Sequence, residues 1–259
     1  MPPRALPRRR LLGAACAAAL LGSAARAADL PALIAASKPS VLPVGTYSAT
    51  GSPRFDFRGS GFVVGDGTLV ATNFHVLPEG AEAESGPQMA VVTGRSGTEG
   101  QARKARVVAT DRNRDLALLQ IEGPPLQPLT LAEAGSAREG QAIALMGYPI
   151  GGTLGYALVT HRGIIASLTT VALPAPTAAH LDPRAISRLR QGNFEVLQLD
   201  ATAYPGNSGG PVLDIETGQV LGIVNQVLVK GSRESALSSP TGITYAIPVT
   251  SLRELIRSR

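Results

Sequence analysis

Short apolar runs separated by glycine-rich turns are the feature of this sequence that most limits its fold. Runs such as Gly61–Val64 and Leu116–Ile121 are too short for stable helices, and turns such as Gly65-Asp66-Gly67 separate them. Such runs are typical of all-β sandwiches and barrels, whereas alternating strands and helices would give longer periodic segments. We therefore predict an all-β fold, with strands near residues 61–64, 68–71, 89–92, 105–108, 116–121, 142–146, 157–160, 163–168, 195–199, 211–213, 220–224 and 244–247.

A proline-rich segment divides the predicted strands into two sets. Proline at the density seen in Gly123–Pro128 cannot lie in a central strand, because proline has no N–H to donate to a neighbour. We expect a connector over about residues 123–140, between halves at about 40–122 and 141–248. Residues 174–192 interrupt the second half, and a short helix could start there.

Short helices are expected at both ends of the folded part of the chain. Asp29 is placed to cap a helix that has Pro31 in its first turn. Residues 250–259 are predicted to form a terminal helix, with Thr250 or Ser251 as its cap.

The first 28 residues have the pattern of a cleaved export signal. Arginines precede the apolar run Leu11–Ala25, and Ala25-Arg26-Ala27 is a small-x-small cleavage signature. The arginine cluster leaves both the Sec and the twin-arginine export routes open. We expect one domain over residues 29–259, periplasmic or secreted, with no stable membrane anchor after processing. The alternatives are an uncleaved anchor and a lipoprotein modified at Cys16.

Charge and cysteine content narrow the classes of partner. The chain has 24 Lys and Arg against 19 Asp and Glu, but five arginines and no acid lie within residues 1–28, so 19 of each sign remain. This balance does not indicate a nucleic-acid-binding surface. The single cysteine, Cys16, leaves with the signal, so we expect no disulfide and no thiolate metal site. No cofactor and no metal is expected.

The stretch Pro205–Pro211 places Ser208 in a tight turn lined by glycines. Such a turn can expose a hydroxyl and direct backbone N–H groups at one point, which are the needs of a nucleophile and of an oxyanion. Asn, Gly and Pro are also ordinary turn residues, so the turn alone does not indicate an enzyme. A base and an acid elsewhere in the chain would have to complete the site.

Two further residues are the candidate partners of Ser208. His75 ends a strand-like run, and Asp115 stands directly before a strongly apolar run. The chain order His, Asp, Ser is one of the known orders of a catalytic triad. Asp111 and Asp200 are rival acids, although Asp200 is close enough in sequence to support the Ser208 loop instead.

The two other histidines, His161 and His180, are interpreted as solvated loop residues. His161 stands next to Arg162 and Gly163 in a segment that reads as a turn, and His180 lies in the irregular residues 174–192.

Three segments resemble the active-site segments of HtrA/Deg-type serine proteases, within the trypsin-like class: Thr72–Val76, Asp111–Leu119 and Pro205–Pro211. Further likeness lies at residues 29–41, 159–160 with 163–165, 221–225 and 244–248. The resemblance implies two packed six-stranded antiparallel β-barrels with the site in the cleft between them. HtrA proteases usually carry a PDZ domain after this part, and we expect none here. Residues 174–192 are long for a loop that shapes the site in that family.

The resemblance also implies a mechanism and a set of roles. Ser208 would attack the peptide carbonyl to form an acyl-enzyme, His75 would act as the base, and Asp115 would orient the imidazole. The backbone N–H groups of Gly206 and Ser208 would hold the oxyanion. The residues that would line the substrate pocket and pair with the substrate backbone are Thr202, Ala203, Val224, Asn225, Gln226 and Val227. No acidic residue stands at the base of this pocket, so small aliphatic side chains are the expected preference.

The predicted function is therefore an exported serine endopeptidase. Its partners would be protein or peptide substrates, including unfolded proteins, and not nucleic acid; a trimer and a monomer both stay open. One alternative is a catalytically silent protease fold that serves as a binding or chaperone-like module. The other is a structural β-protein in which the Ser208 turn is coincidental.

Overall fold

The computed structural model describes residues 29–83, 85–94, 100–149, 156–171, 194–225 and 242–259. The first half contains β1 (Val41–Tyr47), β2 (Phe55–Val64), β3 (Leu69–Thr72), β4 (Met89–Thr93), β5 (Gln101–Asp111) and β6 (Leu116–Ile121). The second half contains β7 (Ala142–Gly147), β8 (Val159–Val171), β9 (Phe194–Asp200), β10 (Pro211–Asp214), β11 (Val220–Asn225) and β12 (Ile243–Pro248).

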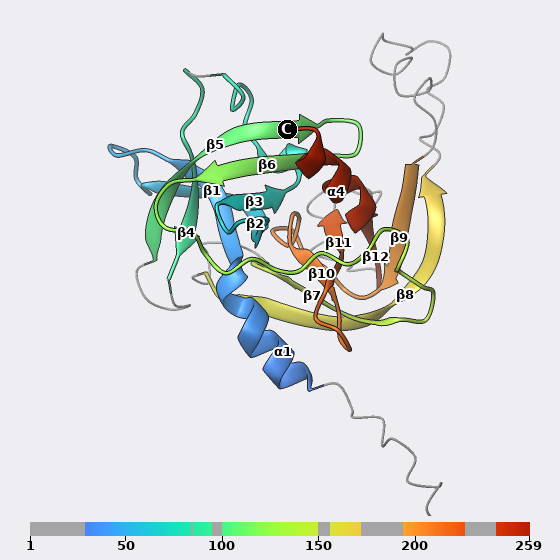
Figure 1. Ribbon diagram of the computed structural model, residues 1–259. Coiled ribbons are helices and arrows are strands. Elements are labelled where there is room, and N and C mark those ends of the chain that lie inside the picture. Colours follow the sequence, from blue (N-terminus) through green and yellow to red (C-terminus); the bar gives the residue numbers. More distant parts are fainter. Residues whose placement is uncertain (1–28, 84, 95–99, 150–155, 172–193, 226–241) are drawn as a thin grey trace, which may run out of the picture.

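Each set of strands closes into an antiparallel barrel, as Figure 1 shows. The strand orders are β1-β2-β3-β6-β5-β4 and β10-β11-β12-β9-β8-β7. The helices are α1 (Leu30–Ser37), the short 3₁₀ turns η2 (Lys38–Ser40) and η3 (Phe74–Val76), and α4 (Val249–Arg257). The predicted fold class, with two six-stranded barrels and short helices at both ends, is confirmed.

Alternate residues of four first-barrel strands, β1, β2, β3 and β6, are buried in two different places. In β6, Ala117 and Leu119 pack inside the first barrel with Val63 of β2, whereas Leu116 and Leu118 join a larger cluster that includes the second barrel's core. Strands that are buried on both faces have no polar alternation, because neither face meets water. This explains why β6 reads in the sequence as an unbroken apolar run.

The segment between the barrels runs without a named strand but is pinned to both of them. The N–H of Leu129 donates to the carbonyl of Val63 in β2, at 2.9 Å, and the N–H of Ala132 donates to the carbonyl of Val220 in β11, at 3.0 Å. Helix α4 contacts β5 and β6 of one barrel and β11 and β12 of the other. These contacts fix the relative placement of the two barrels, and with it any site that draws residues from both.

The structure corrects two details of the sequence-based prediction. Residues 157–160 and 163–168 were expected as separate strands, but β8 runs unbroken through both, because His161, Arg162 and Gly163 pair with β7 across the sheet. Helix α4 has Pro248 at its N-cap with no side-chain cap, so the capping role expected of Thr250 or Ser251 is wrong. The predicted cap of α1 is confirmed, since the Asp29 carboxylate accepts from the N–H of Ala32 at 3.2 Å.

No helix in the described part of the chain has the length and apolar character needed to span a bilayer.

Candidate active site

His75 and Asp115 are in direct contact at one end of the first barrel. The Nδ1 atom of His75 lies 2.6 Å from Oδ2 of Asp115, and the His75 backbone N–H donates to Oδ1 at 2.8 Å. A carboxylate can only accept, so Nδ1 carries the proton, and in the neutral ring the lone pair is on Nε2. The imidazole is thus held in the tautomer that a general base requires.

The backbone around each residue fixes this contact. His75 lies in η3, whose last carbonyls have no partner inside so short a turn. Arg58 of β2 supplies one, since its Nε donates to the carbonyl of Val76 at 2.6 Å. Asp115 has a φ of 56°, a left-handed conformation that aspartate tolerates better than most residues. Its carbonyl accepts from Phe74 N–H at 3.1 Å, which ties the two segments together.

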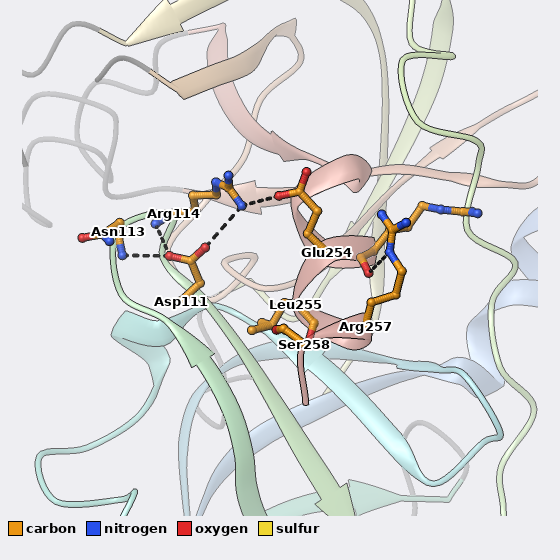
Figure 2. A network of polar contacts seen from close by, with 8 residues as sticks. Asp111, Asn113, Arg114, Glu254, Leu255, Arg257 and Ser258 are labelled. Atoms are coloured by element: carbon orange, nitrogen blue, oxygen red, sulfur yellow. Dashed lines mark hydrogen bonds and ion pairs between the residues drawn. The ribbon is translucent and has the colours of Figure 1, made fainter. Parts of the chain in front are cut away.

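A polar network next to Asp115 joins its turn to helix α4. Asp111 accepts from the N–H groups of Asn113 and Arg114, at 3.1 and 3.0 Å, and so closes the turn between β5 and β6. The Arg114 guanidinium lies between Asp111, at 3.5 Å, and Glu254 of α4, at 2.6 Å (Figure 2). Asp111, a rival acid in the sequence, therefore serves as a turn residue, while Asp115 faces the histidine.

Ser208 is almost completely buried, at 5 % exposed, and lies in the second of two consecutive turns. In the first, Asn207 N–H donates to the carbonyl of Tyr204 at 2.9 Å, and Gly206 has a φ of 104°. In the second, Gly210 N–H donates to the carbonyl of Asn207 at 2.9 Å. Proline followed by a residue of positive φ is the pattern of a type II turn. A type I turn would need a φ near about −90° at Gly206 and would reverse the peptide that carries its N–H.

The Ser208 turn comes from the second barrel but rests on the first. The N–H of Ser60 in β2 donates to the carbonyl of Ser208 at 2.8 Å, and the Thr72 hydroxyl of β3 donates to the carbonyl of Ser60 at 2.7 Å. A Cβ at Gly209 would stand only 3.2 Å from the backbone N of Asn73, two positions before His75. These contacts place the serine backbone against the segment that leads into the histidine.

Asn225 joins the second barrel to the acid. Its Nδ2 donates to Oδ2 of Asp115 at 2.8 Å, and the residue is 2 % exposed. The carboxylate of Asp115 therefore accepts from His75 N–H, His75 Nδ1 and Asn225, which satisfies a charge that is only partly exposed to water. The residues expected to form a triad thus draw on both barrels.

The predicted substrate-binding residues differ in their burial and in whether the structure describes them. Thr202 and Ala203 are half-buried just before the Ser208 turn, and Gln226 and Val227 lie outside the described residues. Val224 is buried in β11, with its N–H and carbonyl already bonded to Gly210 and Gly209. Its backbone therefore offers no free edge to a substrate strand.

The interpretation of His161 as a solvated loop residue is wrong. It lies within β8, opposite Leu145 of β7, and its ring centroid is 5.8 Å from that of Tyr204. Its Nε2 is buried without a partner among the described residues, and burial lowers the pKa of this histidine below its usual 6.5. His180 lies outside the described residues. Asp200 is exposed at the end of β9, and among the described residues its carboxylate makes no hydrogen bond to the Ser208 loop.

Three residues of the site carry no role in the sequence-based prediction: Ser60, Arg58 and Asn73. The Nδ2 of Asn73 donates to the carbonyl of Asp115 at 3.0 Å. Asn225 was expected near substrate, but its amide contacts the acid. The run Gly59-Ser60-Gly61 could have pointed to Ser60, because glycines on both sides of a residue indicate close backbone approach.

The described residues contain no group of three or more His, Cys, Asp or Glu side chains arranged to hold a metal ion. Separately, the structure shows a histidine oriented by a carboxylate, in a segment against which the turn of Ser208 packs.

Comparison with known proteins agrees with the geometry. A family model described as a trypsin-like peptidase domain matches residues 59–223, from strand β2, which carries Ser60, into strand β11. The chain belongs to this trypsin-like peptidase family.

The chain is 31 % identical over 200 residues to "Protease Do-like 5, chloroplastic" of Arabidopsis thaliana. This alignment covers 76 % of the chain and 55 % of the relative. The chain is 29 % identical over 191 residues to "Probable periplasmic serine endoprotease DegP-like" of Halomonas elongata, covering 74 % of the chain and 32 % of the relative. The chain thus spans between about a third and just over half of the length of these relatives.

The solved structure of "HtrA-type protease AlgW with decapeptide" superposes with a TM-score of 0.63 at 22 % identity. The superposition covers 88 % of this chain and 66 % of that one. At this level of identity the likeness establishes the shared double-barrel fold, and the roles of individual residues must come from the site itself.

Proposed function

We propose that the domain is an exported serine endopeptidase of the HtrA type that cleaves peptide bonds in protein substrates. The observation that carries the proposal is the contact between Nδ1 of His75 and Oδ2 of Asp115, at 2.6 Å, beside the glycine-lined turn of Ser208. The serine protease and serine endoprotease names of the relatives support the same activity.

In this proposal each residue of the triad has its own step. Ser208 attacks the carbonyl carbon, and Nε2 of His75 takes the hydroxyl proton, which it later gives to the leaving amine. Asp115 keeps Nδ1 protonated and stabilises the imidazolium that forms. Water then repeats the attack on the acyl-enzyme with the same base, which releases the second product and restores Ser208.

The oxyanion is held by the N–H groups of Gly206 and Ser208 in this proposal. The positive φ of Gly206 and the bond from Asn207 N–H to the carbonyl of Tyr204 support it, because a type II turn directs the Gly206 N–H to the side opposite to that in a type I turn. Such preorganised donors act on the charge that develops in the transition state.

Export is the second part of the proposal. It rests on the arginine-led apolar segment within residues 1–28 and on relatives that are named as periplasmic. Protein or peptide substrates are consistent with the peptide-bound structure of the similar protease.

Active-site labelling with a fluorophosphonate tests the enzyme against the silent binding module. The wild-type domain should label at one serine, and Ser208→Ala should remove both the label and at least about 10³-fold of the peptidase activity. A matched control is Ser40→Ala, which removes another buried serine hydroxyl, one that bonds to Gln127, and should leave labelling intact. Labelling that persists in Ser208→Ala would assign the nucleophile elsewhere, and a wild-type protein that never labels would favour the binding module.

A further inference from the structure

The hydroxyl of Ser60 bonds to both the nucleophile turn and the end of strand β7. Its Oγ donates to the carbonyl of Gly206 at 2.6 Å and accepts from the N–H of Tyr148 at 2.9 Å. Ser60 is 0 % exposed. Water therefore cannot replace either bond without a change in the packing.

The direction of these bonds is fixed by elementary chemistry. A serine hydroxyl has one proton, and the Tyr148 N–H can only donate to it. The proton of Ser60 is therefore free to point at the Gly206 carbonyl, and the short Oγ–O distance is consistent with a full hydrogen bond. The bond from Tyr148 leaves Ser60 little freedom to turn elsewhere.

Ser60 also bonds to the turn through its backbone. Its N–H donates to the carbonyl of Ser208 at 2.8 Å, so one residue of the first barrel contacts the turn on both sides of Asn207. The two proposed oxyanion donors, Gly206 and Ser208, are the two residues whose carbonyls Ser60 binds. Gly147 leaves the room for this arrangement, since a Cβ there would stand 3.0 Å from Ser60 Oγ and 2.8 Å from Asn207 Oδ1.

We propose that Ser60 is a positioning residue for the oxyanion hole: its hydroxyl holds the Gly206 carbonyl so that the Gly206 and Ser208 N–H groups stay directed at one point. This inference rests on the proposed function. It assigns Ser60 an effect on the transition state rather than on substrate affinity, because an oxyanion exists only after attack. Removing the hydroxyl frees a buried carbonyl, and the turn relaxes to satisfy it.

The test compares Ser60→Ala with Ser40→Ala in the full domain. Loss of one oxyanion donor costs about 10²–10³-fold in kcat, so a displaced donor should cost about tenfold, with KM for a peptide substrate within about twofold of wild type. Ser40 is the matched control because it is also 0 % exposed and donates to a backbone carbonyl at 2.7 Å, on Gln127 of the connector. Ser40→Ala should keep the wild-type kcat. Wild-type kcat in Ser60→Ala, or an equal loss in both variants, overturns the inference.

Two further measurements test the role of Ser60 if Ser60→Ala does not fold or if the wild-type protein is inactive. Ser60→Cys retains a weak donor of similar shape, and should show the same fall in kcat to a smaller degree if Ser60→Ala does not fold. In a crystal structure of either variant the Gly206 carbonyl should turn away from its present direction, and an unmoved carbonyl overturns the inference even if the wild-type protein proves inactive. A wild type that labels at Ser208, together with a Ser60→Ala protein of normal kcat, refutes the role of Ser60 alone.

Discussion

Substitution of Gly209 by alanine should lower the free energy of unfolding for two separate reasons, a strained backbone and a steric clash. Gly209 has a φ of 85°, and left-handed backbone costs an ordinary residue about 1–2 kcal/mol. A Cβ there would also stand well under 3.0 Å from the carbonyl oxygen of Ser60 and from the hydroxyl of Thr72. Both atoms are buried and bonded to each other, so the clash can be relieved only by moving backbone, and overpacking of this kind costs about 1–3 kcal/mol. The free energy of unfolding should fall by about 2–5 kcal/mol in total.

Gly140→Ala is the control that separates the two contributions. Gly140 has a φ of 79°, but a Cβ added there would meet no other atom within 4 Å, so only the backbone cost of about 1–2 kcal/mol applies. Urea unfolding of the wild type and both variants, with unchanged m values, gives the free energies. Gly209→Ala should be the less stable variant by about 1–3 kcal/mol and should also label more slowly with fluorophosphonate, because Ser208 moves with its neighbour. Equal stability of the two variants would refute the close approach of the Ser208 turn to the first barrel.

Two further predictions concern buried polar side chains beside the site. Asn225→Ala should slow labelling of Ser208 by about tenfold or more, because hydrogen bonds to charged groups contribute about 1.5–3 kcal/mol, and Asn225→Ser should lose less; an unchanged rate in Asn225→Ala would remove Asn225 from the site. Burial lowers the pKa of His161, so protons bind preferentially to the unfolded chain, and the stability that neutral His161 contributes is present above pH 6.5 and is lost as the pH falls below it. His161→Phe keeps a ring against Tyr204 without this titration, so its free energy of unfolding should fall less than that of the wild type between about pH 7 and 5, and parallel falls would contradict the assignment.

The strands were predictable where burial makes a run of neighbouring residues apolar. Leu116–Ile121 is apolar throughout because both of its faces are covered, and β6 has the predicted bounds. The prediction failed at His161 and Arg162, whose polarity beside Gly163 resembles a turn although the three residues pair with β7. A strand's neighbours decide whether polar residues continue it, and those neighbours are remote in sequence.

In the candidate site, too, features set by neighbouring residues were predictable, whereas contacts between distant residues were not. The order of His75, Asp115 and Ser208 and the residues around them were enough to predict the family, because turn chemistry and strand ends are local features of the chain. The roles of the three residues stay a proposal. The sequence also has glycine at positions 206 and 209, where the structure shows positive φ.

The tertiary structure alone decided which side chains hold these residues in place. Asp111 and Asp115 are four positions apart with the same side chain, yet one closes a turn and the other accepts from His75 and Asn225. Ser60 reaches Gly206 across 146 positions of sequence, and only closure of both barrels brings the two together. Local pattern determines which residues can do the chemistry, whereas the packing of distant strands determines which polar groups meet, because each buried donor must find its acceptor wherever the chain places one.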